Sequence, residues 1–282
     1  MFPWLRPRPG RTYLAGAPLL VAHRGGSRLA PENTLTAFRQ ALELWGADML
    51  ELDVRCTRDG RVVVIHDETV DRTTQGRGRV ADFDWAELRD LDAGYRFTDP
   101  AGEHAYRGRG VRIPLFEEIL ESFGDVRLNV EAKEPGAAEP MVEMVRRHGA
   151  EHRVLLAAEH EASRREVRGY PGPWGASRPQ IFRFWISSRL PRGGPYVPRA
   201  DILQVPETWR GRRIVSPGFV AAAHRRNIPV QVWTVDDPHD MRRLLSWGVD
   251  GIQTDRPDIL ARILHEEVGR PLPPGLAKET SA

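Results

Sequence analysis

Charged and imidazole side chains follow several apolar stretches of this 282-residue sequence. Acidic residues two positions apart on a strand project to the same side of it, which places paired carboxylates together. A buried strand would otherwise carry apolar residues at such positions, so the repeated placement indicates a site. The residues are His23 and Arg24 after "LLVA", Glu51 and Asp53 in "MLELDV", His66 and Asp67 after "VVVI", Glu131 and Lys133 in "LNVEAKE", and later Gln204, Trp233, Thr254 and Asp255.

The types of these residues indicate one chemistry. The carboxylates of Glu51, Asp53 and Glu131 would repel one another unless a cation lay among them, and hard oxygen ligands favour Mg²⁺ or Ca²⁺. Arg24 and Lys133 add positive charge of the kind that binds a phosphate group. Two histidines provide a general base and a general acid that work near neutral pH. The combination predicts hydrolysis of a phosphate ester.

Each residue also has a structural interpretation. A single histidine at the end of a strand is more often a hydrogen-bonded part of the framework than a catalyst. Taken alone, Glu51 and Asp53 form an ordinary polar strand face, and Lys133 can simply pair with Glu131. Trp233 in "VQVWTV" fits a core position as well as the wall of a pocket. The placement of all these residues at the same end of successive strands favours a site.

The elements that must position these residues alternate along the chain. The stretch "LLVAHRGG" is followed by "NTLTAFRQALELWG", whose apolar residues recur at helical spacing. The preceding "PENT" predicts a turn and a helix start capped by Asn33 or Thr34. Strand followed by helix, repeated almost to the end of the chain, predicts an α/β fold with parallel strands inside helices. A TIM-type (β/α)₈ barrel is the expected architecture, and a doubly wound open sheet is the alternative.

Two regions depart from this alternation. The turn "RDG" joins "ELDVRCT" to "RVVVIHD" as a hairpin, so "VVVIHD" is either a barrel strand or part of a side hairpin. Residues 68–110 are poor in apolar runs, and we expect them to form a small insertion over the catalytic mouth. The segment "PWGAS" is expected to be a short, weak strand. We expect one barrel domain over residues 1–270 and a flexible tail over 271–282.

The composition limits the classes of function. A formal net charge of +2 and the absence of a Lys/Arg block apart from the acids argue against a nucleic-acid partner. The single Cys56 offers neither an internal disulfide nor a cysteine metal site, which fits a reducing compartment. No transmembrane segment is expected, and prolines and arginines interrupt the N-terminus where a signal peptide would be apolar. We expect a cytoplasmic protein, and its oligomeric state does not follow from the sequence.

The order and spacing of ten segments resemble the glycerophosphodiester phosphodiesterase family. The resemblance runs from about residue 18 to 262 and includes the expected insertion. Its segments are "VAHRGG", "PENT", "ELDV", "VVVIHD", "DRTT", "GRVADF", "IPLFEEIL", "NVEAKE", "VWTVDD" and "GVDGIQTDRPD". The resemblance implies a TIM barrel, one divalent cation, and hydrolysis of a small-molecule glycerophosphodiester to glycerol 3-phosphate and an alcohol.

The resemblance also implies roles for individual residues. His23 and His66 correspond to the acid–base pair, with the glycines after Arg24 letting backbone and ligand approach closely. The nucleophile is water or the glycerol 2-hydroxyl, and either histidine can be the base. The implied metal ligands are Glu51, Asp53 and Glu131, and the implied contacts to the phosphate and the pocket are Arg24, Lys133 and Trp233.

One departure and two alternatives bear on the substrate. Where the family commonly ends its fifth strand in Ser-Phe, this chain has Ala158 and Glu159. A lysophospholipase D-type or sphingolipid-directed phosphodiesterase would need an apolar surface for acyl chains. A binding module that only senses a glycerophosphodiester would have no use for an acid–base pair. Aromatic residues that could provide the apolar surface are Trp85, Trp174, Phe182, Phe184 and Trp185.

Overall fold

The computed structural model describes residues 13–157 and 161–279. Parallel strands form its centre, in the order β5-β4-β2-β1-β10-β9-β6. The first strand pairs with the last, with Leu19 opposite Gly251, so the two ends of the strand sequence meet. These strands are β1 (Leu19–Ala22), β2 (Met49–Cys56), β4 (Arg127–Ala132), β5 (Val154–Ala157), β6 (Leu203–Pro206), β9 (Val230–Trp233) and β10 (Gly251–Thr254).

The sheet closes through a short segment between β5 and β6. Trp174 forms a parallel bridge with Leu156, and Gly175 forms one with Ile202. The backbone amide of Gly175 donates to the carbonyl of Leu156 at 2.9 Å, which continues the ladder. "PWGAS" therefore supplies the eighth position of a barrel that is closed by these bridges. The expected (β/α)₈ barrel is confirmed, and the open doubly wound sheet is wrong.

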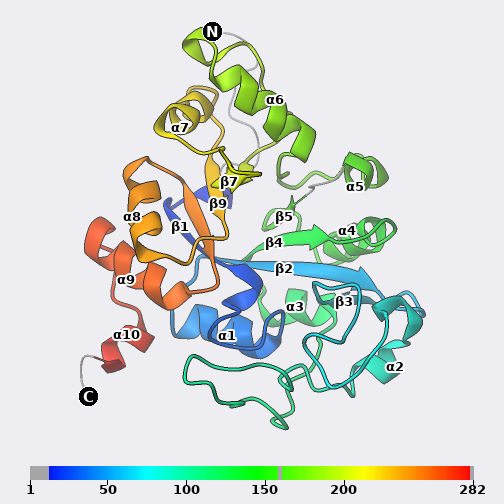
Figure 1. Ribbon diagram of the computed structural model, residues 1–282. Helices are drawn as coiled ribbons and strands as arrows, with labels where there is room; N and C mark the ends of the chain where they lie inside the picture. The colour runs from blue at the N-terminus through cyan, green and yellow to red at the C-terminus, as the bar shows by residue number, and fades with distance from the viewer. Residues whose placement is uncertain (1–12, 158–160, 280–282) are drawn as a thin grey trace.

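Helices surround the strands, with α8 and α9 on one side and α4 on the other (Figure 1). Helix α1 begins after Thr34, whose hydroxyl accepts from the backbone amide of Ala37, and it buries Phe38 against the barrel. The helices of the described part are α1 (Leu35–Glu43), α2 (Trp85–Leu88), α3 (Phe116–Ser122), α4 (Ala138–Arg147), α5 (Glu161–Glu166), α6 (Arg178–Ser188), α7 (Pro217–His224), α8 (Pro238–Ser246), α9 (Pro257–Val268) and α10 (Pro274–Glu279), with short 3₁₀ turns η3 (His23–Gly25), η4 (Val80–Asp82) and η5 (Pro191–Gly193).

Strand β2 shows how the alternation of side chains positions a site inside the barrel. Leu50, Leu52 and Val54 point outward and pack in the core under the helices. The intervening side chains face the interior, as expected for a period of two. Near the start of β2 the inward residue is Met49, which packs with Tyr13, Val21, Leu155 and Ile202. Further along, the inward residues are Glu51 and Asp53, so an apolar layer closes one end and the carboxylates occupy the other.

The stretch after β2 forms a side hairpin. Strand β3 (Val62–Val64) runs antiparallel to β2, with Cys56 opposite Val62, so "VVVIHD" is not a barrel strand. Residues 68–110 follow and contain η4 and α2, and α2 lies at the lower right of Figure 1. They bury Val70, Val80 and Leu88 against Val63 and Ile65 of the hairpin region, forming a small core of their own.

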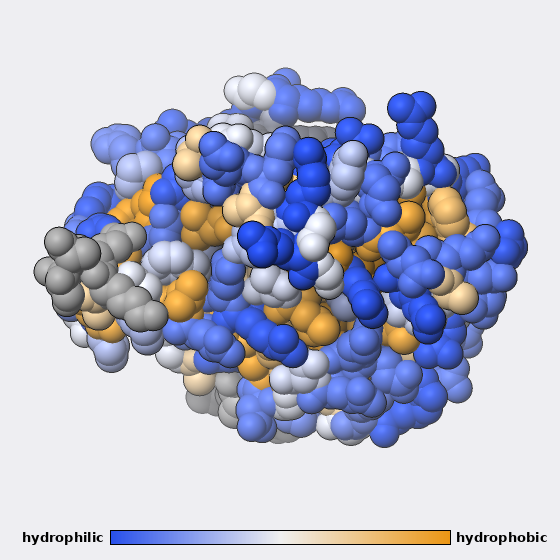
Figure 2. Space-filling view, turned by 90° about the horizontal axis from the view of Figure 1, so that it is seen from below, coloured by the Kyte–Doolittle hydropathy of each residue, from blue (hydrophilic) through white to orange (hydrophobic). Residues whose placement is uncertain are grey.

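The chain after α9 returns to the barrel. Leu276 of α10 is only 2% exposed, and the backbone amide of Gly275 donates to the carbonyl of Leu44 at 2.9 Å. The segment expected as a flexible tail therefore packs against the body of the protein at these residues. Seen from below, the surface is mostly hydrophilic, and hydrophobic side chains show in separate places (Figure 2). Within the described residues, no helix has the length and apolar character needed to span a membrane.

Candidate active site

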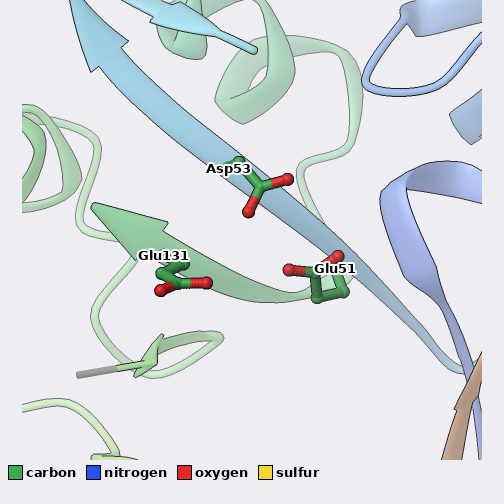
Figure 3. Close-up of side chains that lie close together, drawn as sticks. All are labelled: Glu51, Asp53 and Glu131. Atoms are coloured by element: carbon green, nitrogen blue, oxygen red, sulfur yellow. The ribbon is translucent and has the colours of Figure 1, made fainter. Parts of the chain in front are cut away.

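Three carboxylates converge at the mouth of the barrel. Glu51 and Asp53 lie two residues apart on β2, and Glu131 lies on the neighbouring β4 in register with Asp53. Figure 3 shows the three side chains on adjacent strands, facing a shared space. One oxygen from each carboxylate lies within 4.8 Å of the others. The side chains of Glu51 and Asp53 are buried, so their charges are poorly screened by water.

Two cations compensate part of this charge. The ammonium of Lys133 lies 3.0 Å from Oδ1 of Asp53 and 2.7 Å from Oε2 of Glu131. Nε of Arg24 lies 3.3 Å from Oδ2 of Asp53. Burial alone would raise the pKa of Asp53, but Lys133 and Arg24 together hold that pKa below its ordinary value. Both expected phosphate contacts therefore pair with carboxylates in this structure.

Glu51 is less compensated by positive charge than Asp53. Burial raises its pKa to about 7, with a further contribution from the charge of Asp53. Its Oε2 accepts from the backbone amide of Arg24 at 3.0 Å. A buried acid whose ionised form is this disfavoured gains from a cation placed beside it. All three donors are carboxylate oxygens, so the residues fit a hard divalent cation.

The turn after β1 places His23 and Arg24 at this cluster. Arg24 has φ 51° and the following Gly25 and Gly26 have φ 84° and 90°, all in the left-handed region. A Cβ on Gly25 would lie 2.7 Å from Cβ of Ala37, and one on Gly26 would lie 2.8 Å from the ring of Pro257. The glycines are therefore required by the turn and by its packing on α1 and α9, in addition to any approach of a ligand.

His23 is held by a carboxylate from the opposite end of the chain. Its Nδ1 lies 2.7 Å from Oδ1 of Asp255, directly after β10, and its Nε2 lies 3.8 Å from Oε2 of Glu51. Burial alone would lower the pKa of His23. The charge of Glu51 and the hydrogen bond with Asp255 outweigh burial, so the pKa is raised. His23 is therefore the histidine whose protonated form is favoured.

His66 has the same type of anchor with the opposite shift. Its Nδ1 lies 2.7 Å from Oδ1 of Asp67. Burial is the largest influence and lowers the pKa of His66 despite the nearby Asp53 and Asp67. Burial would raise the pKa of Asp67, but hydrogen bonds from Arg72 and His66 lower it to about 2. Because an ionised carboxylate only accepts, Nδ1 of His66 carries the hydrogen and Nε2 is the free acceptor.

Asn33, Glu32 and Arg72 support the site, although no motif in the sequence predicts this role for them. Asn33 donates from Nδ2 to Oδ2 of Asp53 at 3.0 Å, and Thr34 alone caps α1. The carboxylate of Glu32 lies between two guanidinium groups. Its Oε1 is 3.0 Å from Nη1 of Arg24, and its Oε2 is 2.6 Å from Nη1 of Arg72. The segment "PENT" is thus part of the site as well as a helix start. No period or spacing in the sequence distinguishes these polar contacts from an ordinary turn.

All eight residues selected from the sequence as catalytic, metal-binding or substrate-binding line one cavity of about 720 Å³. His23, Arg24, Glu51, Asp53, His66, Glu131, Lys133 and Trp233 form part of its wall. The middle of the barrel adds the polar side chains of Asn129, Gln204 and Gln253. Apolar side chains form another part of the wall: Ile181, Phe182, Trp185, Trp209 and Ile214.

Only two of the five aromatic residues considered for an acyl-chain surface line this cavity, Phe182 and Trp185. Phe184 is buried in the core, edge-on to Phe219. Trp85 packs against the small core inside the insertion, and Trp174 packs on Tyr170. The rim residues Ala158 and Glu159 lie outside the described residues.

The insertion meets the site at its edge. Of the described residues, none between 68 and 110 lines the cavity. Its contribution is Arg72, whose guanidinium lies 2.5 Å from Asp67 through Nε and bonds Glu32 with two nitrogens. The insertion therefore reaches the mouth beside His66, while the remainder packs on the hairpin.

A closed parallel barrel with histidines and an acidic cluster together in one cavity at the ends of its strands is the arrangement of a barrel enzyme. The model of the Glycerophosphoryl diester phosphodiesterase family matches residues 23–167 and 183–259. The chain belongs to this family of enzymes.

Individual relatives agree with this assignment over almost their whole length. The chain is 36% identical over 256 residues to the glycerophosphodiester phosphodiesterase of Caldanaerobacter subterraneus, covering 88% of this chain and 98% of the relative. The crystal structure of a glycerophosphodiester phosphodiesterase from Agrobacterium tumefaciens has a TM-score of 0.71 at 30% identity, over 86% and 99% of the two chains. A phosphodiesterase of Oleispira antarctica, solved with the product sn-glycerol-3-phosphate, shares the fold with a TM-score of 0.71 at 23% identity, over 89% and 98%.

Proposed function

We propose that this protein hydrolyses glycerophosphodiesters to glycerol 3-phosphate and an alcohol, using a divalent cation and histidine acid–base catalysis. The observation that carries the proposal is the shared cavity of two histidines, each anchored at Nδ1 by a carboxylate, and the acidic cluster. The names of the matched relatives support the substrate class.

One divalent cation, Mg²⁺ or Ca²⁺, is proposed at Glu51, Asp53 and Glu131. When bound, it would neutralise charge on the phosphoryl oxygens of the substrate. Arg24 and Lys133 now pair with the carboxylates. With the carboxylates balanced, the two positive charges are available to the phosphate, where Arg24 offers a planar set of donors and Lys133 a point charge.

The opposite pKa shifts of the histidines support a division of roles in the proposed reaction. His66, with its lowered pKa, is neutral near pH 7 and accepts a proton from the nucleophile at Nε2. In the proposed reaction His23, whose raised pKa favours the protonated form, donates from Nε2 to the leaving oxygen. Asp255 and Asp67 each accept a hydrogen bond from Nδ1 of the ring beside them, which leaves Nε2 of both histidines for proton transfer. Part of the shift of His23 comes from Asp255, which is outside the acidic cluster.

The nucleophile is water or the 2-hydroxyl of the substrate glycerol. Attack by the 2-hydroxyl forms a cyclic phosphate and releases the alcohol, and water then opens the ring. Attack by water gives both products in one step. A substrate analogue that lacks the 2-hydroxyl separates the two routes, because it reacts only by direct attack of water.

The proposal is tested by initial rates with glycerophosphocholine and Mg²⁺ or Ca²⁺, following release of glycerol 3-phosphate. Wild type should turn over, while His23→Ala and His66→Ala should each lose about 10²–10⁴-fold in turnover. Both variants should keep a cooperative melting curve and bind the cation. If either variant retains the wild-type rate, that histidine is structural and the proposed acid–base pair is wrong.

Lysophosphatidylcholine should be included as the alternative substrate, because Phe182 and Trp185 lie in the cavity wall. Faster turnover of this lipid than of glycerophosphocholine would replace the proposed substrate class with the lysophospholipase D-type class. A cytoplasmic location is part of the proposal, supported by the single Cys56. Cell fractionation with an antibody to the protein tests that location.

A further inference from the structure

Helix α6 carries an exposed apolar stripe beside the cavity. Phe182, Ile186 and Leu190 follow one another at intervals of four residues, so they lie along one face of the helix and its C-terminal turn. These residues are 50%, 46% and 50% exposed. Trp209, on the hairpin of β7 (Thr208–Trp209) and β8 (Arg212–Arg213), is 48% exposed and shares the cavity wall with Phe182. We call these four residues the α6 surface.

Contacts between α6 and the hairpin hold the α6 surface together. The indole Nε1 of Trp185 donates to the carbonyl of Arg213 at 3.2 Å. The ring of Phe182 stacks on that of Trp185, with 6.1 Å between the ring centroids. Single exposed apolar residues are common, but a group of them at the mouth of a cavity indicates an interaction surface.

The chain around the α6 surface is positively charged. Residues 167–200 contain six arginines and neither Asp nor Glu. The near-neutral charge of the whole chain conceals this local excess of arginine. Arginines also cover the aromatic rings, with the guanidinium of Arg189 3.5 Å from the centroid of Trp185 and that of Arg210 5.0 Å from Trp209.

We propose that the α6 surface docks on an anionic lipid surface. Aromatic and aliphatic side chains flanked by arginines match the boundary between lipid headgroups and acyl chains, where the apolar groups insert and the cations meet lipid phosphates. Phe182 and Trp209 line the cavity, so docking brings its mouth to the membrane. The inference concerns binding and does not depend on the reaction proposed for the cavity.

The charge distribution favours lipid over other occupants. A second copy docked through the same surface would place arginines opposite arginines, which repel. A nucleic acid would use the arginines but leave the apolar stripe exposed. An anionic lipid surface satisfies both features, because it has phosphates above an apolar layer.

Vesicle sedimentation tests the proposal with the full chain. Wild type should bind vesicles of phosphatidylcholine with phosphatidylglycerol and bind pure phosphatidylcholine vesicles much more weakly, and salt should reduce the difference. The double variant Ile186→Ser/Leu190→Ser should bind the anionic vesicles about tenfold more weakly, or 1.4 kcal/mol. Neither residue lines the cavity, so turnover of glycerophosphocholine should stay unchanged. Val268→Ser/Leu272→Ser is the matched control, because those residues are 47% and 37% exposed and lie away from α6.

A second variant tests the charge. Arg183→Gln/Arg210→Gln should weaken binding to anionic vesicles at low salt and leave binding to phosphatidylcholine vesicles unchanged. The proposal is overturned if wild type binds neither vesicle, or if the Ile186→Ser/Leu190→Ser variant binds as wild type does. It is also overturned if light scattering shows that this variant changes the oligomeric state and not the vesicle binding, since the surface then belongs to a second copy.

Discussion

Nδ1 of His23 lies 2.7 Å from Oδ1 of Asp255, a contact between the end of the first barrel strand and the end of the last. His66 has an equivalent contact with Asp67, also at 2.7 Å. In both pairs the carboxylate fixes Nδ1 as a donor and leaves Nε2 for proton exchange. The closure of the barrel is therefore what completes the anchor of His23.

Removing the charge of Asp255 should change the pH dependence of the reaction. Asp255→Asn takes away an interaction that raises the pKa of His23. A general acid must be protonated, so activity falls as pH rises through its pKa, and lowering that pKa moves the fall to lower pH. The pH profile of kcat measures this shift, and an alkaline limb that stays in place would contradict the role of His23 as acid. His224→Gln is the control, because His224 makes a 2.7 Å contact with Asp250 outside the cavity.

Arg72 should position His66 through Asp67. Arg72→Met removes the bonds from Arg72 to Asp67 and Glu32 and should lower kcat more than it raises KM, because the base loses its fixed orientation. Arg72→Lys should recover only part of the lost kcat, since an ammonium cannot reproduce the paired bonds of the guanidinium to Asp67 and Glu32. Arg79→Met, which breaks an exposed pair with Glu68, is the control. Equal rates for Arg72→Met and Arg79→Met would show that the insertion does not support catalysis.

Stability without metal should fall as pH rises. The pKa of Glu51 is about 7 in the folded protein against an ordinary 4.5. The folded state therefore binds more protons between these values, and the free energy of unfolding decreases as pH rises through them. Glu51→Gln should remove this decrease and stabilise the metal-free protein at pH 8. Thermal melting in EDTA at pH 6 and pH 8 checks it, and an unchanged pH dependence in the variant would show that Glu51 is not the group responsible.

A bound cation should restore the stability that repulsion among the three carboxylates removes. At a hundredfold excess over its Kd, Mg²⁺ or Ca²⁺ should stabilise the folded protein by about 2.7 kcal/mol. The increase in Tm should be larger at pH 8 than at pH 6, because the cation and a proton compete for Glu51. Glu51→Gln should show much less of the increase. A Tm that does not respond to either cation at pH 8 would argue against the metal site.

The insertion should be dispensable for folding of the barrel. The two largest core clusters contain no residue between 68 and 110. Replacing this segment with a short Gly/Ser linker should leave a cooperative melting curve and a strong loss of activity, since Arg72 is removed. Loss of cooperative melting would show that the insertion belongs to the barrel wall, against the single barrel domain with an appended insertion that we propose.

Much of the fold and site follows from local sequence rules. The period-two pattern of "MLELDV" identifies Glu51 and Asp53 as inward neighbours, and the β/α alternation predicts the barrel. The contacts of Asn33 with Asp53 and of Arg72 with Asp67 do not follow, because they join loops whose conformation no period encodes. The opposite pKa shifts of His23 and His66 depend on burial, which exists only in the folded chain. The glycines of "HRGG" are understood only from their contacts with Ala37 and Pro257.

The proposed enzyme is a cation-dependent phosphodiesterase whose acid and base are His23 and His66. Its most direct test is release of glycerol 3-phosphate from glycerophosphocholine by protein treated exhaustively with EDTA, before and after addition of Mg²⁺ or Ca²⁺. The chelated wild type should release no glycerol 3-phosphate, addition of one of these cations should restore the release, and His66→Ala should show no restoration. Full activity after chelation would contradict the metal site, and restoration in His66→Ala would contradict the acid–base pair.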